Sequence, residues 1–212
     1  MVSAPRYVPV LHWEPLPYLV IVFLLVLTGA IRPEHGGWYV LLLFAIALTA
    51  GWGVIAFMRE RRTRNPDPMG GLTGLDGLAI VDAPALAASV RAVVPVADTH
   101  RHQSAIEIAR VHGGPDLHAV LVPRARRWLS PRYRVGVQLI AAGTGDARPR
   151  HAGFLREDAD ARWRDRLDAL RVDGRYVRVP ARITGAAQPR GVELDVSGLE
   201  SVVGPEPGNR PQ

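Results

Sequence analysis

A short arginine-rich loop carries the side chains with the clearest chemical potential. The stretch "VPRARRWLSPRYRV", residues 122–135, holds five arginines, one tryptophan and one tyrosine, and no acidic residue. Guanidinium groups bind phosphate, and exposed aromatic rings stack on nucleobases. The loop could equally face anionic lipid, or be solvated surface around a core tryptophan. The candidate nucleic-acid- or anion-binding residues are Arg124, Arg126, Arg127, Trp128, Arg132, Tyr133 and Arg134, with His102 from an earlier loop.

Other motifs give little support for catalysis or metal binding. Asp98, His100 and His102 form a weak H-x-H pattern, and no HExxH or Cys/His framework accompanies it. The chain has no G-x-S-x-G motif, and without lysine it has no P-loop lysine. The acids Glu157, Asp158 and Asp160 suit the first turn of a helix without any chemistry. We therefore expect neither an enzyme, nor a metal, nor a cofactor.

Composition favours anionic partners. All 26 basic residues are arginine, the chain has no lysine, and its net charge is +6 at pH 7. The bias toward arginine, alanine, glycine, valine and proline is typical of a GC-rich bacterial genome. We therefore attribute the use of arginine in place of lysine to this bias and not to function. The positive charge attracts nucleic acid or acidic lipid. The absence of cysteine excludes disulfides, thiolate metal sites and a cysteine nucleophile.

The first 64 residues predict a transmembrane helical hairpin. Two uncharged runs, at about residues 16–31 and 38–58, are separated by the turn "RPEHGG". About 20 apolar residues cross a bilayer, and the second run meets that length, while the first is short. A signal peptide would need a basic start and a small-residue cleavage site, and a buried core hairpin would show polar positions at helical spacing.

The charges that flank the second run predict the orientation. A basic flank follows it directly, and by the positive-inside rule this flank is cytoplasmic. Two spans then place both termini in the cytoplasm, so the expected location is the cell (inner) membrane, with a multi-pass topology. Small residues at four-residue spacing in the second run suit close helix packing, and a homo-oligomer is a further option. The basic flank consists of Arg59, Arg61, Arg62 and Arg64.

The remainder predicts a linker and a folded domain. Residues 65–85 are rich in proline and glycine and are expected to be a linker that is too apolar to be a pure spacer. Residues 86–203 predict five or six short strands, and residues 204–212 a disordered tail. The expected strands lie at 89–97, 118–123, 133–142, 150–155, 174–185 and 191–198, and the expected helices at 101–111 and 156–172.

The fold class expected from this pattern is α+β. It comprises the N-terminal two-helix transmembrane hairpin, followed by a small, mostly antiparallel β-barrel or sandwich domain with one or two capping helices. In the second expected helix, Trp163, Leu167 and Leu170 form an apolar stripe that should face the core. Pro180 predicts that its strand is an edge or bulged strand.

The order of segments resembles the HIRAN domain family from about Val93 to Val196. The segment "GFLREDA", Gly153–Ala159, is the most specific part of the resemblance. Where the family has "NPYD", this chain has Ser130, Pro131, Arg132 and Tyr133, and His102 stands where the family has an aromatic residue. The segments that carry the resemblance are "HRHQSAI", "AVLVP", "SPRYRVGVQL", "AGFLREDA", "RYVRVPARITG" and "GVELDV".

Two functions remain open from the sequence. The resemblance implies binding of single-stranded or ended DNA on the small barrel, by a membrane-anchored cytoplasmic module. The alternative is a membrane-proximal scaffold that has lost nucleotide recognition and binds a protein or anionic lipid. Nucleic acid, the membrane, a protein partner and a second copy of the chain are therefore the candidate partners.

Overall fold

The fold is described from a computed structural model, which divides into two compact units. The larger unit comprises Met1–Arg6, Asn65–Arg127 and Arg132–Gln212, and the smaller comprises Tyr7–Arg64 and Trp128–Pro131. Each unit is described by itself. The structure describes residues 6–10, 13, 15–30, 33–63, 65–85, 92–113, 117–127, 129–141 and 148–204.

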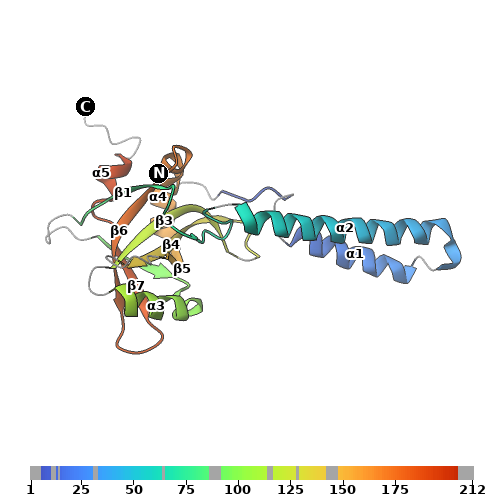
Figure 1. The fold of residues 1–212 in the computed structure, drawn as a ribbon, viewed down its shortest axis with the longest axis horizontal. Helices are drawn as coiled ribbons and strands as arrows, with labels where there is room; N and C mark the ends of the chain where they lie inside the picture. The colour runs from blue at the N-terminus through green and yellow to red at the C-terminus, as the bar shows by residue number, and fades with distance from the viewer. Residues whose placement is uncertain are drawn as a thin grey trace. The chain divides into compact units, whose positions relative to one another are not determined.

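The smaller unit is built on two helices that contact each other, α1 (Leu16–Ala30) and α2 (Gly37–Thr63). The short helix η2 (Pro33–His35) and Gly36, whose φ of 54° is left-handed, connect them. A Cβ atom on Gly53 would lie 3.6 Å from the Cβ of Pro17, so a small residue allows close approach of the helices at this point. Figure 1 labels both helices.

One of the two helices is long and apolar enough to cross a membrane. That stretch is Gly37–Ile55 of α2, whereas α1 is apolar but has only 15 residues. Large apolar side chains are exposed on both, including Phe23, Trp38 and Phe44. The hydroxyl of Thr49 donates to the carbonyl of Ala45 at 2.8 Å, so this polar group is satisfied within the helix.

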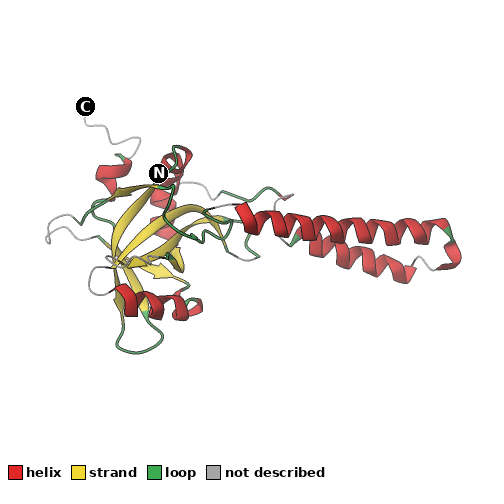
Figure 2. Ribbon diagram, viewed as in Figure 1, coloured by secondary structure: helices red, strands yellow, loops and turns green. Residues whose placement is uncertain are grey.

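The larger unit is α+β and contains a closed antiparallel barrel, as expected from the strand pattern. Six strands close in the order β6-β3-β4-β5-β2-β7, because β6 also pairs with β7, and β1 adds to β6 in parallel. Figure 2 draws the strands of this unit in yellow and its helices in red. The strands are β1 (Ala79–Asp82), β2 (Val93–Ala97), β3 (Leu117–Arg126), β4 (Tyr133–Ala141), β5 (Arg150–Leu155), β6 (Arg175–Thr184) and β7 (Gly191–Asp195).

Two strands close the barrel by changing partner along their length. The first half of β6 pairs with β1 and its last four residues pair with β7. Pro180 lies between these two pairings, opposite His118 of β3. A proline has no N–H to donate to a ladder, so this position between partners tolerates it. Likewise β2 pairs with β7 through Val93–Pro95 and with β5 through Val96 and Ala97.

Helices cover the barrel and fill its core. α3 (Gln103–Gly113) contacts β4 and β5, and α4 (Glu157–Val172) contacts β3, β4 and β6. The short helices η4 (Thr99–Arg101) and α5 (Leu199–Val203) complete the unit. The apolar stripe of α4 packs into the main core, together with inward residues of every barrel strand. Those three stripe residues are Trp163, Leu167 and Leu170.

The segment expected to be a linker is part of the larger unit. Residues 79–82 form β1, and Leu72 is buried in a second apolar cluster with Val120, Val122, Ile140 and Tyr176. Alternate residues of β3 face this cluster and the main core, so β3 is buried on both faces. The Pro/Gly content therefore reflects tight turns rather than a free spacer. The expected boundary at 86 and most of the tail after 204 lie outside the described residues.

Candidate anion-binding site

The arginine-rich loop connects β3 to β4, and its arginines diverge from one another. The pairing of β3 with β4 shifts register between Val122 and Ala125, and Arg124 in this bulge has a left-handed φ of 58°. A bulge redirects the side chains around it. As a result four arginines of the loop reach three separate acids, which are Asp168 for Arg124, Asp98 for Arg127 and Arg134, and Glu157 for Arg132.

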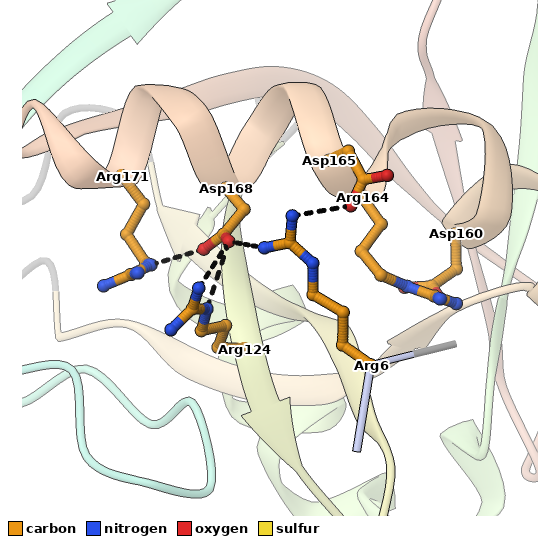
Figure 3. Close-up of polar contacts among 7 residues, drawn as sticks. All are labelled: Arg6, Arg124, Asp160, Arg164, Asp165, Asp168 and Arg171. Atoms are coloured by element: carbon orange, nitrogen blue, oxygen red, sulfur yellow. Dashed lines mark hydrogen bonds and ion pairs between the residues drawn. The ribbon is translucent and has the colours of Figure 1, made fainter. Parts of the chain in front are cut away.

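Arg124 turns toward α4. Its Nε and Nη2 atoms donate to Oδ2 of Asp168 at 3.1 and 2.9 Å (Figure 3). Asp168 is buried, and it also accepts hydrogen bonds from Arg6 and Arg171. Burial raises the pKa of Asp168, but the hydrogen bonds and charges of Arg171 and Arg124 outweigh it and hold the pKa below its usual value. This carboxylate is therefore ionised and heavily compensated.

Arg127 and Arg134 converge on Asp98. Their Nη1 atoms lie 3.6 and 3.7 Å from Oδ2 of Asp98, beyond hydrogen-bond distance. That oxygen is buried and accepts no hydrogen bond in the described part of the chain. Asp98 itself has a left-handed φ of 63°, uncommon for a residue other than glycine. Arg134 also donates to the carbonyl of Leu155 at 2.8 Å, which fixes its guanidinium beside the barrel.

Three rings lie next to this pair of arginines. The guanidinium carbon of Arg134 is 5.3 Å from the centroid of the Phe154 ring. The ring of His151 makes edge contacts with Phe154 and with His102, at centroid distances of 5.1 and 4.5 Å. His102 follows η4, the turn that Asp98 precedes. Asp98, His102, Arg127, Arg134 and His151 thus form a site on the larger unit, hereafter the Asp98 site.

Gln138 determines the tautomer of His151. Its Nε2 atom contacts both the carbonyl oxygen of Gly70 and Nδ1 of His151, the latter at 2.8 Å. A carbonyl can only accept, so the atom between them is the amide nitrogen, and Nδ1 of His151 must accept as well. The proton of the neutral ring is therefore on Nε2. Oε1 of Gln138 is buried without a hydrogen bond in the described part of the chain.

Both histidines of the site are held neutral. Burial, and then the neighbouring His102, lower the pKa of His151 to about 4. Burial also lowers the pKa of His102, with Arg101 and His100 acting in the same direction and Asp98 opposing them. At neutral pH the two arginines therefore supply the positive charge of the site and the histidines supply uncharged rings.

The partly buried His151 should make stability depend on pH. Its pKa is about 4 in the folded chain and about 6.5 when exposed, so the unfolded state binds the proton more readily. The contribution of neutral His151 to the free energy of unfolding is fully present above pH 6.5 and decreases as the pH falls toward 4. Relative to His151→Gln, the wild type should lose up to about 3 kcal/mol over this range. Urea titrations of both full chains in neutral detergent measure this, and parallel pH curves would contradict it.

The other predicted site residues do not join the Asp98 site through any described contact. Nη1 of Arg132 lies 4.0 Å from Glu157. The backbone N–H of Arg126 donates to the carbonyl of Pro68, and that of Tyr133 donates to the carbonyl of Arg6. Trp128 lies outside the described residues, as do the side chains of Arg59, Arg61, Arg62 and Arg64.

The structure adds site residues that were not predicted as binding residues. Asp98 stands out in the sequence only as part of a weak metal pattern, and Gln138, His151 and Phe154 only as strand residues. In the part of the chain that the structure describes, no group of three His, Asp or Glu side chains is placed to hold a metal ion. No protein-family model matches the chain, and neither a curated protein nor a solved structure matches it.

Proposed function

We propose that this protein is a membrane-anchored module that binds single-stranded or ended nucleic acid at the Asp98 site. The observation that carries the proposal is the convergence of Arg127 and Arg134 on one carboxylate, beside His102. Two guanidinium groups face one acid at 3.6 and 3.7 Å, so one positive charge is not neutralised. The resemblance to HIRAN domains, some of which bind single-stranded DNA ends on a small barrel, is consistent with this assignment.

The spacing of the ion pairs favours a ligand at this site. Hydrogen-bonded arginines elsewhere in the unit lie much closer to their acids, as in the 2.8 Å contact of Arg171 with Asp168. Phosphate oxygens accept short, charge-assisted hydrogen bonds from guanidinium groups, which Asp98 does not provide here. A phosphate could therefore bind Arg127 and Arg134 without first breaking a hydrogen bond to Asp98.

The neighbouring ring adds a surface for a base. His102 is half-buried and neutral, and we propose that the exposed part of its uncharged imidazole stacks on a nucleobase. Stacking of this kind contributes about 1–3 kcal/mol per base and tolerates any sequence. Phe154 is buried and supports Arg134 rather than meeting the ligand. The proposed mode is thus phosphate on the arginines and a base on His102.

The anchoring part of the proposal rests on α2. Its Gly37–Ile55 stretch meets the length and composition of a span. We propose that α1 accompanies it as the second span of a hairpin, with both termini in the cytoplasm, next to the basic flank of α2. The chain should remain in the pellet after alkaline extraction of membranes, and a C-terminal tag should resist protease in sealed cells. Release by alkali would contradict the anchoring without bearing on the Asp98 site.

Oligonucleotide binding tests the Asp98 site. In nanodiscs of zwitterionic lipid, the full chain should bind a fluorescent single strand, and Arg127→Ala/Arg134→Ala should weaken binding roughly ten-fold or more. The slope of log affinity against log salt should decrease by about 1.4, because two phosphate contacts are lost. Fluorescence anisotropy over a salt series measures both quantities.

A matched control separates this site from general positive charge. Arg175→Ala/Arg182→Ala removes the same charge from exposed arginines that pair with Asp173 and Glu193. It should leave both the affinity and the salt slope close to those of the wild type. Equal losses in the two double variants, or no salt-dependent binding by the wild type, would contradict the proposed function.

A further inference from the structure

A second arginine cluster surrounds Asp168 on α4, and it shares no residue with the Asp98 site. Arg6, Arg124 and Arg171 all donate to the carboxylate of Asp168, and Nη2 of Arg6 also lies 3.1 Å from Asp165 (Figure 3). Arg6 precedes the first helix, Arg124 lies in the β3 bulge, and Arg171 ends α4. We call these three arginines, together with Asp168, the Asp168 cluster.

The Asp168 cluster contains more positive charge than its own ion pairs require. Three guanidinium groups face two carboxylates, and Asp165 is 48% exposed and therefore screened by water. Elsewhere on α4 the buried Asp160 pairs with one arginine, Arg164, and also accepts a backbone N–H. The terminal nitrogens of Arg171 and Nη1 of Arg124 donate no hydrogen bond among the described residues. The cluster therefore retains donors and positive charge for an anion.

Two short stretches of chain connect the Asp168 cluster to the helices of the proposed membrane anchor. Arg6 lies ten residues before Leu16, where α1 begins, and an extended chain covers at most about 3.3–3.6 Å per residue. On the other side, Pro68 follows the end of α2 at Thr63 by five residues, and its carbonyl accepts the backbone N–H of Arg126, two residues from Arg124. The cluster is therefore joined to the start of α1 and to the end of α2 by about ten residues or fewer.

We propose that the Asp168 cluster binds the phosphate group of an anionic phospholipid headgroup. This inference rests on the membrane anchoring proposed above and is independent of oligonucleotide binding. Bidentate guanidinium contacts suit a phosphate diester, and a single headgroup fits a compact cluster flanked by acids. A nucleic-acid strand carries many phosphates, and Asp165 and Asp168 would repel those that follow the first. Binding would hold the barrel unit against the lipid surface.

Lipid binding by the purified full chain tests the proposal. Phosphatidylglycerol or phosphatidylcholine is titrated into the protein in a neutral detergent, and bound lipid is counted by native mass spectrometry. The wild type should prefer phosphatidylglycerol. Arg6→Ala/Arg171→Ala should reduce the affinity for phosphatidylglycerol roughly ten-fold and leave that for phosphatidylcholine unchanged. This variant keeps Asp168 paired with Arg124, and circular dichroism verifies that it folds.

The outcomes separate this inference from the proposed function. Arg175→Ala/Arg182→Ala, which removes the same charge elsewhere, should bind phosphatidylglycerol as the wild type does. Equal affinity for the two lipids, or an unchanged double variant, would overturn the inference. Displacement of phosphatidylglycerol by millimolar inorganic phosphate or by a single-stranded oligonucleotide would overturn it as well, in favour of a soluble ligand. None of these results alters alkaline extraction or the effect of Arg127→Ala/Arg134→Ala.

Discussion

Replacing Asp160 by alanine is expected to lower the free energy of unfolding of the barrel by about 3–5 kcal/mol. Asp160 is 1% exposed, and its Oδ1 accepts the backbone N–H of Val135 in β4 at 2.7 Å. Its Oδ2 accepts from Arg164, whose side chain is 9% exposed. Alanine would remove the carboxylate that pairs with the buried guanidinium of Arg164 and leave a buried N–H without its acceptor, and both losses are unfavourable.

Hydrogen exchange of β4 peptides in the full chain measures this effect, because the amides of a central strand report opening of the whole unit. Asp158→Ala is the matched control, since Asp158 is an acid of the same helical turn and its side chain is 61% exposed. Its pKa is lowered mainly by a hydrogen bond from Arg156, also an exposed side chain. The control should exchange as the wild type does, and similar protection in both variants would contradict the prediction.

Asp158 and Asp160 show which features of a helix a sequence pattern predicts and which it does not. The turn "REDADAR" predicts the start of a helix, and the structure places α4 at Glu157–Val172. The pattern does not separate Asp160 from Asp158, because both have an arginine within four residues along the chain. The difference lies in β4, whose Val135 N–H lies 25 residues away in sequence. Local spacing contains no information about that contact.

The arginine loop shows the same limit on a larger scale. Its charge and its place between two strands were predicted, and the strands are present. The separate acidic partners of the loop arginines were not predicted. Arg124 bonds to Asp168, which is 44 residues away, and it does so because a bulge in the backbone turns its side chain toward α4. Arg127 and Arg134 meet Asp98, which appears in the sequence as part of a weak metal pattern.

The segment of residues 65–85 was also only partly predictable. The apolar residues of 65–85 indicated some docking, but the Pro/Gly content favoured a linker. In the structure Leu72 is buried, and the carbonyl of Gly70 accepts from Gln138 in β4. A Cβ atom on Gly70 would lie 2.4 Å from the Cβ of Ala125, so glycine is required for this approach. Composition cannot distinguish a glycine that gives flexibility from one that permits close packing.

Replacing Gly153 by alanine is expected to destabilise the barrel by about 1–3 kcal/mol through steric overlap alone. Gly153 lies where the pairing of β4 with β5 shifts register, and its φ is 141°. A Cβ atom there would lie 2.1 Å from the carbonyl oxygen of Ala97, which no side-chain rotation relieves. The backbone of β2 or β5 would have to move, and unfavourable φ would add to the loss.

Gly174→Ala isolates the contribution of φ from that of the overlap. Gly174 has a φ of 73° after α4, and a Cβ atom there would meet nothing within 4 Å, so only about 1–2 kcal/mol of backbone strain is expected. Hydrogen exchange of β4 should therefore rank Gly153→Ala below Gly174→Ala in stability. Because Ala97 precedes Asp98, the displaced strand should also move the carboxylate that Arg127 and Arg134 share. Oligonucleotide affinity should then change in Gly153→Ala and stay unchanged in Gly174→Ala. If the affinity of Gly174→Ala changed and that of Gly153→Ala did not, the close packing of Gly153 on Ala97 would not position the Asp98 site.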